Sequence, residues 1–149
     1  TVCVDLADHA LQIDLNGLDQ VLWPVHCVQG SHGADFAEGL HSDKINKIVQ
    51  KGTNIGVDSY SGFADNGQRF ETELHSYLQS QDVDTLYVLG LATDYCVKFT
   101  VLDALARGYT VYLVVDGCRG VNQNPNDSEQ AIKAMEQAGA TVIASLDAC

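Results

Sequence analysis

The order of apolar and polar positions predicts alternating strands and helices over most of the chain. Short segments rich in β-forming residues cover Ile45 to Gln50, Thr85 to Leu89, Thr110 to Val115 and Thr141 to Ala144. Helical patterns separate them, and this alternation is typical of a parallel sheet with helices packed on its faces. Residues 1–40 contain several glycines and little periodicity, so we expect mainly loop there, with one short strand or helical turn. The pattern predicts a single α/β domain over residues 1–149.

Three helices are predicted among these strands. An apolar stripe at helical spacing predicts the first, and it consists of Phe70, Leu74, Tyr77 and Leu78. The second runs from about Asp94 to Arg107 and stops at Gly108. The third has Asp127 or Ser128 as its cap and Gly139 as its end. Its predicted buried face consists of Ala131, Ile132, Met135 and Ala138.

The charge balance excludes two classes of partner. Eight Lys and Arg against 20 Asp and Glu give a net charge of −12, which repels nucleic-acid phosphates and anionic lipid headgroups. No apolar run approaches the roughly 20 residues that span a bilayer, and the first ten residues lack the basic flank of a secretion signal. Five cysteines at irregular spacing, without a Cys-x-x-Cys pair, are typical of reduced thiols. We therefore expect a cytoplasmic protein that binds neither nucleic acid nor membranes.

Candidate chemistry lies where strands end, because ligands bind at the carboxyl ends of strands in open parallel sheets. Lys51 follows the first predicted strand at once, and Cys96 lies in the first turn of the helix that follows the second. Unsatisfied amides and the helix dipole favour a thiolate at such a position, and a neighbouring lysine favours it further. Backbone amides of the turn could hold the oxyanion that forms when a thiolate attacks a carbonyl group.

Taken alone, these residues also allow plain structural roles. Any cysteine is commonly a small buried hydrophobic side chain, and Lys51 by itself is better explained as a solvated charge at a strand end. Aromatic residues commonly belong to the core, as we expect for Phe63. A lone histidine beside a tryptophan and a proline, such as His26, is usually packed or hydrogen-bonded rather than a metal ligand.

Four stretches of the chain match, in order, the motifs of one enzyme family. They read W-P-V-H-C-V at residues 23–28, K-G at 51–52 with Y-S-G-F at 60–63, G-L-A-T-D-Y-C-V at 90–97 and D-G-C-R-G-V at 116–121. These stretches resemble the motifs of nicotinamidases, within the wider isochorismatase-like cysteine hydrolases. The resemblance implies a three-layer αβα fold with a parallel, Rossmann-like sheet.

The resemblance also implies an amidase that converts nicotinamide and water into nicotinate and ammonia, in NAD salvage. In such an enzyme the Cys96 thiolate would attack the amide carbon, Lys51 would support the charged site, and the amides of Ala92 and Cys96 would hold the oxyanion. The peptide between Leu91 and Ala92 would be cis. The walls around the pyridine ring would be Trp23, Tyr60, Phe63 and Tyr95.

A divalent metal ion, such as zinc, iron or manganese, would hold the ring nitrogen in the family, and His26 matches one of its ligands. The family's first strand, with its general-base aspartate, and its D-x-H-x(n)-H metal loop precede the tryptophan, whereas only 22 residues do so here. We therefore do not assign Asp5 as the base. We interpret Asp5, Asp8 and His9 as an accidental echo of the metal loop.

We expect this chain to lack the family's N-terminal strands, either as a fragment of a longer protein or as a natural truncation. Unpaired strand edges and apolar surface in a stand-alone chain favour the fragment. Two alternatives stay open, namely an inactive truncated remnant and another isochorismatase-like amide hydrolase. The pair of Trp23 and His26 argues against the second. The expected partner is a small-molecule substrate, nicotinamide, and the sequence leaves a homo-oligomer open.

Overall fold

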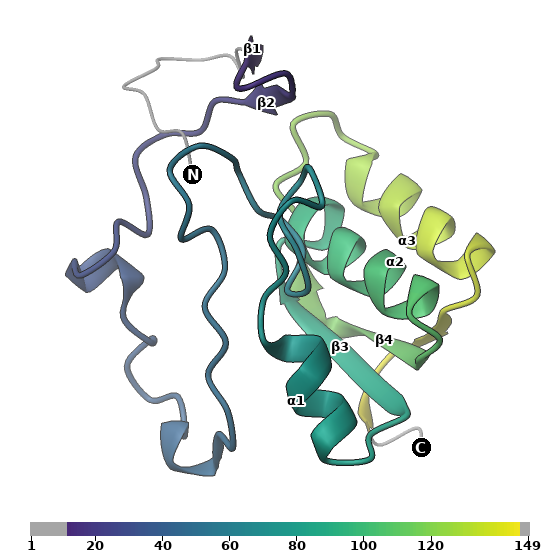
Figure 1. Ribbon diagram of the computed structural model, residues 1–149. Helices are drawn as coiled ribbons and strands as arrows, with labels where there is room; N and C mark the ends of the chain where they lie inside the picture. The colour runs from purple at the N-terminus through teal and green to yellow at the C-terminus, as the bar shows by residue number, and fades with distance from the viewer. Residues whose placement is uncertain (1–11, 147–149) are drawn as a thin grey trace.

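A three-stranded parallel sheet forms the centre of the computed structural model, which describes residues 12–146. Its strands are β3 (Thr85–Leu91), β4 (Thr110–Arg119) and β5 (Thr141–Ile143), in the spatial order β3-β4-β5. The helices α2 (Lys98–Ala106) and α3 (Asp127–Gln137) connect successive strands (Figure 1). The α/β class with a parallel sheet is therefore confirmed. Over residues 12–146, no helix is both long and apolar enough to cross a membrane.

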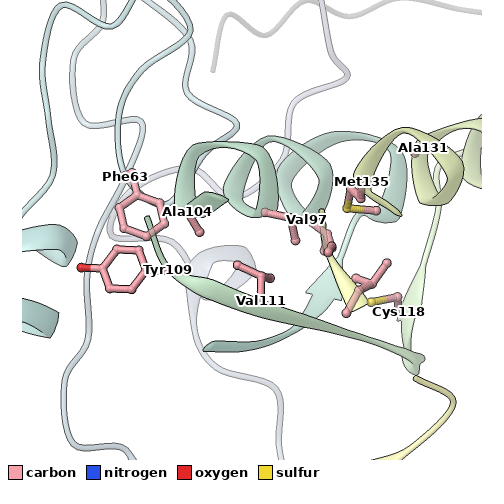
Figure 2. Close-up of a cluster of buried hydrophobic side chains, with 11 residues drawn as sticks. Phe63, Val97, Ala104, Tyr109, Val111, Cys118, Ala131 and Met135 are labelled. Atoms are coloured by element: carbon pink, nitrogen blue, oxygen red, sulfur yellow. The ribbon is translucent and has the colours of Figure 1, made fainter. Parts of the chain in front are cut away.

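The hydrophobic core lies between the sheet and these two helices (Figure 2). Its central members are Val101 and Ala104 of α2, Ala131 and Met135 of α3, and Val111 and Leu113 of β4. Alternate residues of a strand point to the same face, which places Val111 and Leu113 together beneath the helices. The predicted buried face of α3 is confirmed at Ala131 and Met135, which are both buried. Ala138 is exposed instead, because the helix ends at Gln137.

The other face of β3 presents apolar side chains to solvent. Tyr87, Leu89 and Leu91 are 44%, 51% and 73% exposed, and the Tyr87 ring stacks on Tyr112 of β4 with 4.9 Å between centroids. Within the described part of the chain, β3 is an edge strand that pairs with β4 alone. The expected combination of an unpaired strand edge and apolar surface is thus found here.

A π-helical turn, η3 (Thr93–Val97), precedes α2, where the sequence predicted one continuous helix. In this turn the Val97 N–H donates to the Ala92 carbonyl oxygen at 3.0 Å, across five residues rather than four. Both predicted glycine stops are confirmed. Gly108 and Gly139 have φ angles of +87° and +114°, which residues with side chains rarely adopt.

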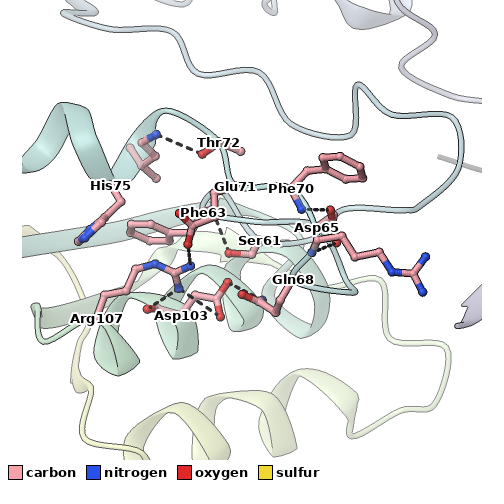
Figure 3. A network of polar contacts seen from close by, with 12 residues as sticks. Ser61, Phe63, Asp65, Gln68, Phe70, Glu71, Thr72, His75, Asp103 and Arg107 are labelled. Atoms are coloured by element: carbon pink, nitrogen blue, oxygen red, sulfur yellow. Dashed lines mark hydrogen bonds and ion pairs between the residues drawn. The ribbon is translucent and has the colours of Figure 1, made fainter.

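α1 (Leu74–Ser80) begins later than the apolar stripe predicted, so the prediction of a helix from Phe70 is wrong at its start. The reason is a turn over residues 65–70, in which the Asp65 carboxylate accepts the N–H groups of Gly67, Arg69 and Phe70 at 2.8, 3.1 and 2.7 Å (Figure 3). Those amides are bound to a side chain and not to helical carbonyl groups. Phe70 is consequently exposed.

The start of α3 also differs from the prediction, since neither Asp127 nor Ser128 caps it. The preceding residue, Asn126, makes no side-chain capping bond. The Ser128 N–H donates instead to Oδ1 of Asn122 at 2.9 Å, and Asp127 accepts the N–H of Asn124 at 2.8 Å. A side chain further upstream therefore satisfies the first turn of the helix.

Residues 12–56 extend beside the α/β body as an arm with little regular structure (Figure 1). It contains a short antiparallel hairpin and two 3-10 turns: β1 (Gln12–Asp14), β2 (Asp19–Val21), η1 (His32–Ala34) and η2 (Ser42–Lys44). The strand predicted from Ile45 to Gln50 is wrong. Ile45 and Ile48 are exposed, and no described strand lies beside this segment to pair with it.

Replacing Met135 with alanine tests the core. Because its side chain is fully buried, the substitution should lower the free energy of unfolding by about 2–5 kcal/mol. Lys133→Ala is the matched control on the exposed face of α3, and it should lower that energy by less than about 1 kcal/mol. Urea unfolding followed by circular dichroism measures both, and equal losses would contradict this placement of α3.

Candidate active site

The structure brings Cys96 and Lys51 together, although 45 residues separate them in the sequence. The Lys51 Nζ donates to the Cys96 Sγ at 3.3 Å and to the carbonyl oxygen of Ser59 at 2.7 Å. Cys96 is half-buried, so its sulfur remains within reach of a small molecule. A thiol in contact with an ammonium group is stabilised in its thiolate form, which is the nucleophilic form.

The turn that holds Cys96 begins directly after β3. The peptide between Leu91 and Ala92 is cis, as the resemblance implied. The carbonyl oxygen of Ala92 accepts the N–H of Tyr95 at 3.1 Å and that of Val97 at 3.0 Å. These two bonds close the turn around Cys96 at the carboxyl end of the strand, the position where parallel sheets bind ligands.

Thr100, one turn further along α2, fixes the position of Cys96 from the other side. Its hydroxyl donates to the Cys96 carbonyl oxygen at 2.6 Å and accepts the Gly62 N–H at 2.9 Å. The Gly62 carbonyl oxygen accepts the Thr72 hydroxyl at 2.6 Å. The turn that holds Cys96 is therefore connected to the loop that contains Tyr60. Sequence reasoning missed Thr100, because the chain shows only a threonine on a helix.

Asp94 is a second residue that the sequence did not single out. It is 8% exposed, and its two carboxylate oxygens accept the N–H groups of Val121 at 2.9 Å and Asn122 at 2.7 Å. The sequence signals were its place inside the stretch at residues 90–97 and its place in the first turn of a helix, where acidic residues are common.

Three aromatic rings that the motifs predicted lie together beside this turn. The Trp23 and Tyr95 ring centroids are 4.7 Å apart, and those of Tyr60 and Tyr95 are 5.3 Å apart. The indole N–H of Trp23 donates to the Tyr60 hydroxyl at 3.2 Å. Phe99 of α2, which the sequence did not single out, adds a fourth ring 5.4 Å from Tyr60. Such a group of rings can hold a flat heteroaromatic ligand by stacking and edge contacts.

Both tyrosines of this group remain neutral over a wide pH range. Burial raises the pKa of Tyr60 to about 12, against the opposing effect of the Trp23 N–H, and the charge of Asp58 adds to the rise. Burial also raises the pKa of Tyr95, with a contribution from the Asp94 carboxylate. Both phenols thus stay protonated where an ordinary thiol, with a pKa of about 8.5, ionises.

Phe63 does not join these rings, in contrast to the place that the resemblance implied, and it lies in the core as expected from the residue alone. It is buried in the hydrophobic core, where it packs on Tyr109 with 5.9 Å between centroids and beneath the Arg107 guanidinium. We therefore assign Phe63 to the core. In the Y-S-G-F stretch, Tyr60 faces Trp23 while Phe63 turns inward.

His26 offers a single imidazole for a metal ion. It is exposed, and its Nδ1 lies 2.6 Å from the carbonyl oxygen of Pro24, which leaves Nε2 as the ligating atom. Among residues 12–146 no group of three or more His, Cys, Asp or Glu is arranged to hold a metal ion. The described residues therefore do not fit a metal site by themselves. Asp5, Asp8 and His9 lie outside the described residues.

The other described cysteines lie elsewhere. Cys118 is buried, with its Sγ 3.3 Å from the carbonyl oxygen of Val114, and Cys27 is exposed in the arm. Neither has the strand-end turn or the lysine contact of Cys96 in the described part of the chain. Cys3 and Cys149 fall outside the described residues.

Comparison with known proteins identifies related sequences. A family model described as the isochorismatase domain matches residues 9–147. The nicotinamidase of Escherichia coli (strain K12) is 53% identical over 133 residues, which is 89% of this chain and 62% of that protein. The chain thus spans less than two thirds of the length of this relative.

Solved structures show the same likeness. An Acinetobacter baumanii nicotinamidase and pyrazinamidase has a TM-score of 0.88 at 38% identity, covering 96% of this chain and 69% of that chain. A pyrazinamidase of Pyrococcus horikoshii in complex with zinc has a TM-score of 0.69 at 39% identity, covering 81% and 62%. These likenesses confirm the three-layer αβα fold class with a Rossmann-like sheet.

Replacing Lys51 with methionine should slow the alkylation of Cys96 at neutral pH by about tenfold, because the ammonium group that favours the thiolate is lost. Lys47→Met is the matched control, since Lys47 lies in the same arm, pairs with Glu73 of the α1 start and does not contact Cys96. The rate is measured with iodoacetamide and peptide mass spectrometry. An unchanged rate in the Lys51 variant would show that Lys51 is a solvated charge that does not affect the reactivity of Cys96.

Metal content gives a separate prediction. After dialysis the 149-residue chain should retain far less than one equivalent of zinc, iron or manganese, because a stable site takes about three or four ligands. Elemental analysis of the chain and of its His26→Ala variant measures this. Stoichiometric metal in the unaltered chain would show that Asp5, Asp8 or His9 completes a site and that we were wrong to dismiss them.

Proposed function

The chain belongs to the isochorismatase domain family, and we propose that it is a nicotinamidase-type amidohydrolase that converts nicotinamide and water into nicotinate and ammonia. The single observation that carries this proposal is the contact between Lys51 and Cys96 at a strand-end turn. The three aromatic rings beside the turn and the 53% identity to a nicotinamidase support a pyridine carboxamide as substrate.

Cys96 is the proposed nucleophile. Its thiolate, in contact with the Lys51 ammonium group, attacks the carboxamide carbon and forms a carbon–sulfur bond. The backbone amides of Ala92 and Cys96 hold the oxyanion of the tetrahedral intermediate. The carbon–nitrogen bond then breaks, and the nitrogen gains one proton and leaves as ammonia. The thiol lost one proton when it formed the thiolate, so no net proton is taken up in these steps. Water hydrolyses the thioester to nicotinate and restores the thiol.

Trp23, Tyr60 and Tyr95 are the proposed walls of the ring site. Their edges and faces meet at 4.7 to 6.5 Å between centroids, which is the range of favourable aromatic contacts. The neutral phenols of Tyr60 and Tyr95 add no negative charge beside the thiolate. We propose that these rings orient the pyridine so that its carboxamide faces Cys96.

A divalent metal ion is part of the proposal, with zinc, iron or manganese as candidates and His26 as one ligand. The zinc complex of the related pyrazinamidase supports a metal in this family of sites. Held there in part by His26, such an ion would supply Lewis-acid chemistry. Because the described residues supply only one ligand, no step of the proposed reaction depends on the metal.

We further propose that residues 1–149 form one domain, that the protein acts in NAD salvage in the cytoplasm, and that a homo-oligomer is compatible with this role.

Two other functions compete with the proposed nicotinamidase activity. The first is an inactive remnant, since the chain spans 62% of the E. coli relative. The second is another isochorismatase-like hydrolase that acts on a different amide, which the Trp23, Tyr60 and Tyr95 group disfavours.

Ammonia release from nicotinamide tests the proposed function. The unaltered chain should release ammonia, and Cys96→Ala should reduce the rate by about a thousandfold or more, because the nucleophile is gone. Cys27→Ala, which changes an exposed thiol in the arm, should leave the rate unchanged.

Two outcomes of this assay contradict the proposal. If neither nicotinamide nor any other amide yields ammonia, this chain is an inactive remnant. If an aliphatic carboxamide is hydrolysed faster than nicotinamide, the chain is an amide hydrolase of another specificity. A circular dichroism spectrum with the same helix content as the unaltered chain ensures that the Cys96 variant is folded.

A further inference from the structure

Asp94 lies two residues before Cys96, in the same π-helical turn, and is almost fully buried. Each of its carboxylate oxygens accepts one backbone N–H, from Val121 at 2.9 Å and from Asn122 at 2.7 Å. Charge-assisted bonds of this kind are roughly twice as strong as neutral ones. The turn that holds Cys96 is therefore attached to the loop that follows β4.

That loop is itself held in place. Asn122 has a φ angle of +53°, and its side-chain Oδ1 accepts the Ser128 N–H in the first turn of α3 at 2.9 Å. α3 in turn packs on the core through Met135. The Asp94 carboxylate thus connects the nucleophile turn, through this loop and α3, to the hydrophobic core.

Tyr95 makes a second, weaker connection to the same loop. Its hydroxyl donates to Oε1 of Gln123 at 2.9 Å, in an exposed position. Two successive residues of the nucleophile turn therefore bind three successive residues of the loop, 121–123. Such a pair of connections restricts both the translation and the rotation of the turn.

The negative charge of Asp94 cannot by itself explain a favourable effect on the Cys96 thiolate. A carboxylate in the same turn as a thiolate disfavours that thiolate, because like charges repel. The two N–H groups bind the carboxylate and the Lys51 ammonium group contacts the sulfur, so no described contact joins the carboxylate to the sulfur. Any favourable effect of the Asp94 carboxylate on the reactivity of Cys96 must therefore come from the position in which it holds the turn.

We propose that Asp94 is a positioning residue, which holds Cys96 in contact with Lys51 by anchoring the nucleophile turn to the loop after β4. The proposal rests on the proposed role of Cys96 as nucleophile. A role in positioning and a role through charge predict opposite changes in the reaction rate of Cys96 when the carboxylate is neutralised. Neutralising the carboxylate should slow the reaction of Cys96 if Asp94 acts by position, and should accelerate it if Asp94 acts by charge alone.

Asp94→Asn is the decisive variant. It keeps the size of the side chain, but its amide NH₂ would face one of the two N–H donors, so one bond is lost. Alkylation of Cys96 by iodoacetamide, followed by peptide mass spectrometry from pH 6 to 10, should slow by about tenfold at pH 7. A rate that is unchanged or higher would overturn the proposal.

Asp65→Asn is the matched control, because Asp65 is a buried carboxylate that also accepts backbone amides and does not contact the nucleophile turn. It should lower the unfolding midpoint in urea yet leave the pH profile of Cys96 alkylation unchanged. A slowing equal to that of Asp94→Asn would mean that any loss of stability slows Cys96, and would overturn the proposal.

Asn122→Gly gives a second variant for the case in which Asp94→Asn does not fold. Glycine tolerates the φ angle of +53° and keeps the N–H that Asp94 accepts, but the bond to Ser128 is lost. Alkylation of Cys96 should slow in the same direction, by about threefold. An unchanged rate in this variant would contradict the anchoring. If Cys96 in the unaltered chain is not the fastest-reacting cysteine, the proposed function fails independently of Asp94.

Discussion

The contact between the Lys51 ammonium group and the Cys96 sulfur is the interaction on which the proposed chemistry depends. Neither residue is chemically distinctive by itself, and 45 residues separate them in the chain. The contact exists because β3 ends in a closed turn, and because the Ser59 carbonyl oxygen holds the lysine at 2.7 Å. Thr100 then connects the turn that holds Cys96 to the same loop through Gly62.

The sequence predicted the elements that local patterns determine. β3, β4 and β5 lie where short β-rich segments were found, and the helices end at Gly108 and Gly139, where only glycine adopts the required φ angle without strain. The segment from Ile45 to Gln50 had the same apolar character. It forms no strand, because pairing requires a neighbour that composition cannot supply.

The candidate site was predicted only in part, for the same reason. Motifs identified Cys96, Lys51 and the rings of Trp23, Tyr60 and Tyr95, and the structure brings these residues together. Asp94 and Thr100 act through backbone groups of distant segments, so no spacing in the sequence reveals them. Phe63 shows the opposite kind of error. Its motif implied a place in the ring wall, whereas its packing places it in the core.

The covalent intermediate is the most direct test of this account. The chain is mixed with nicotinamide, quenched in acid within a turnover, digested and examined by mass spectrometry. The account predicts a nicotinoyl group bound as a thioester to the peptide that contains Cys96, and its loss on treatment with hydroxylamine. Ammonia release without any acylated Cys96, or a nicotinoyl group on another residue, would contradict the central claim.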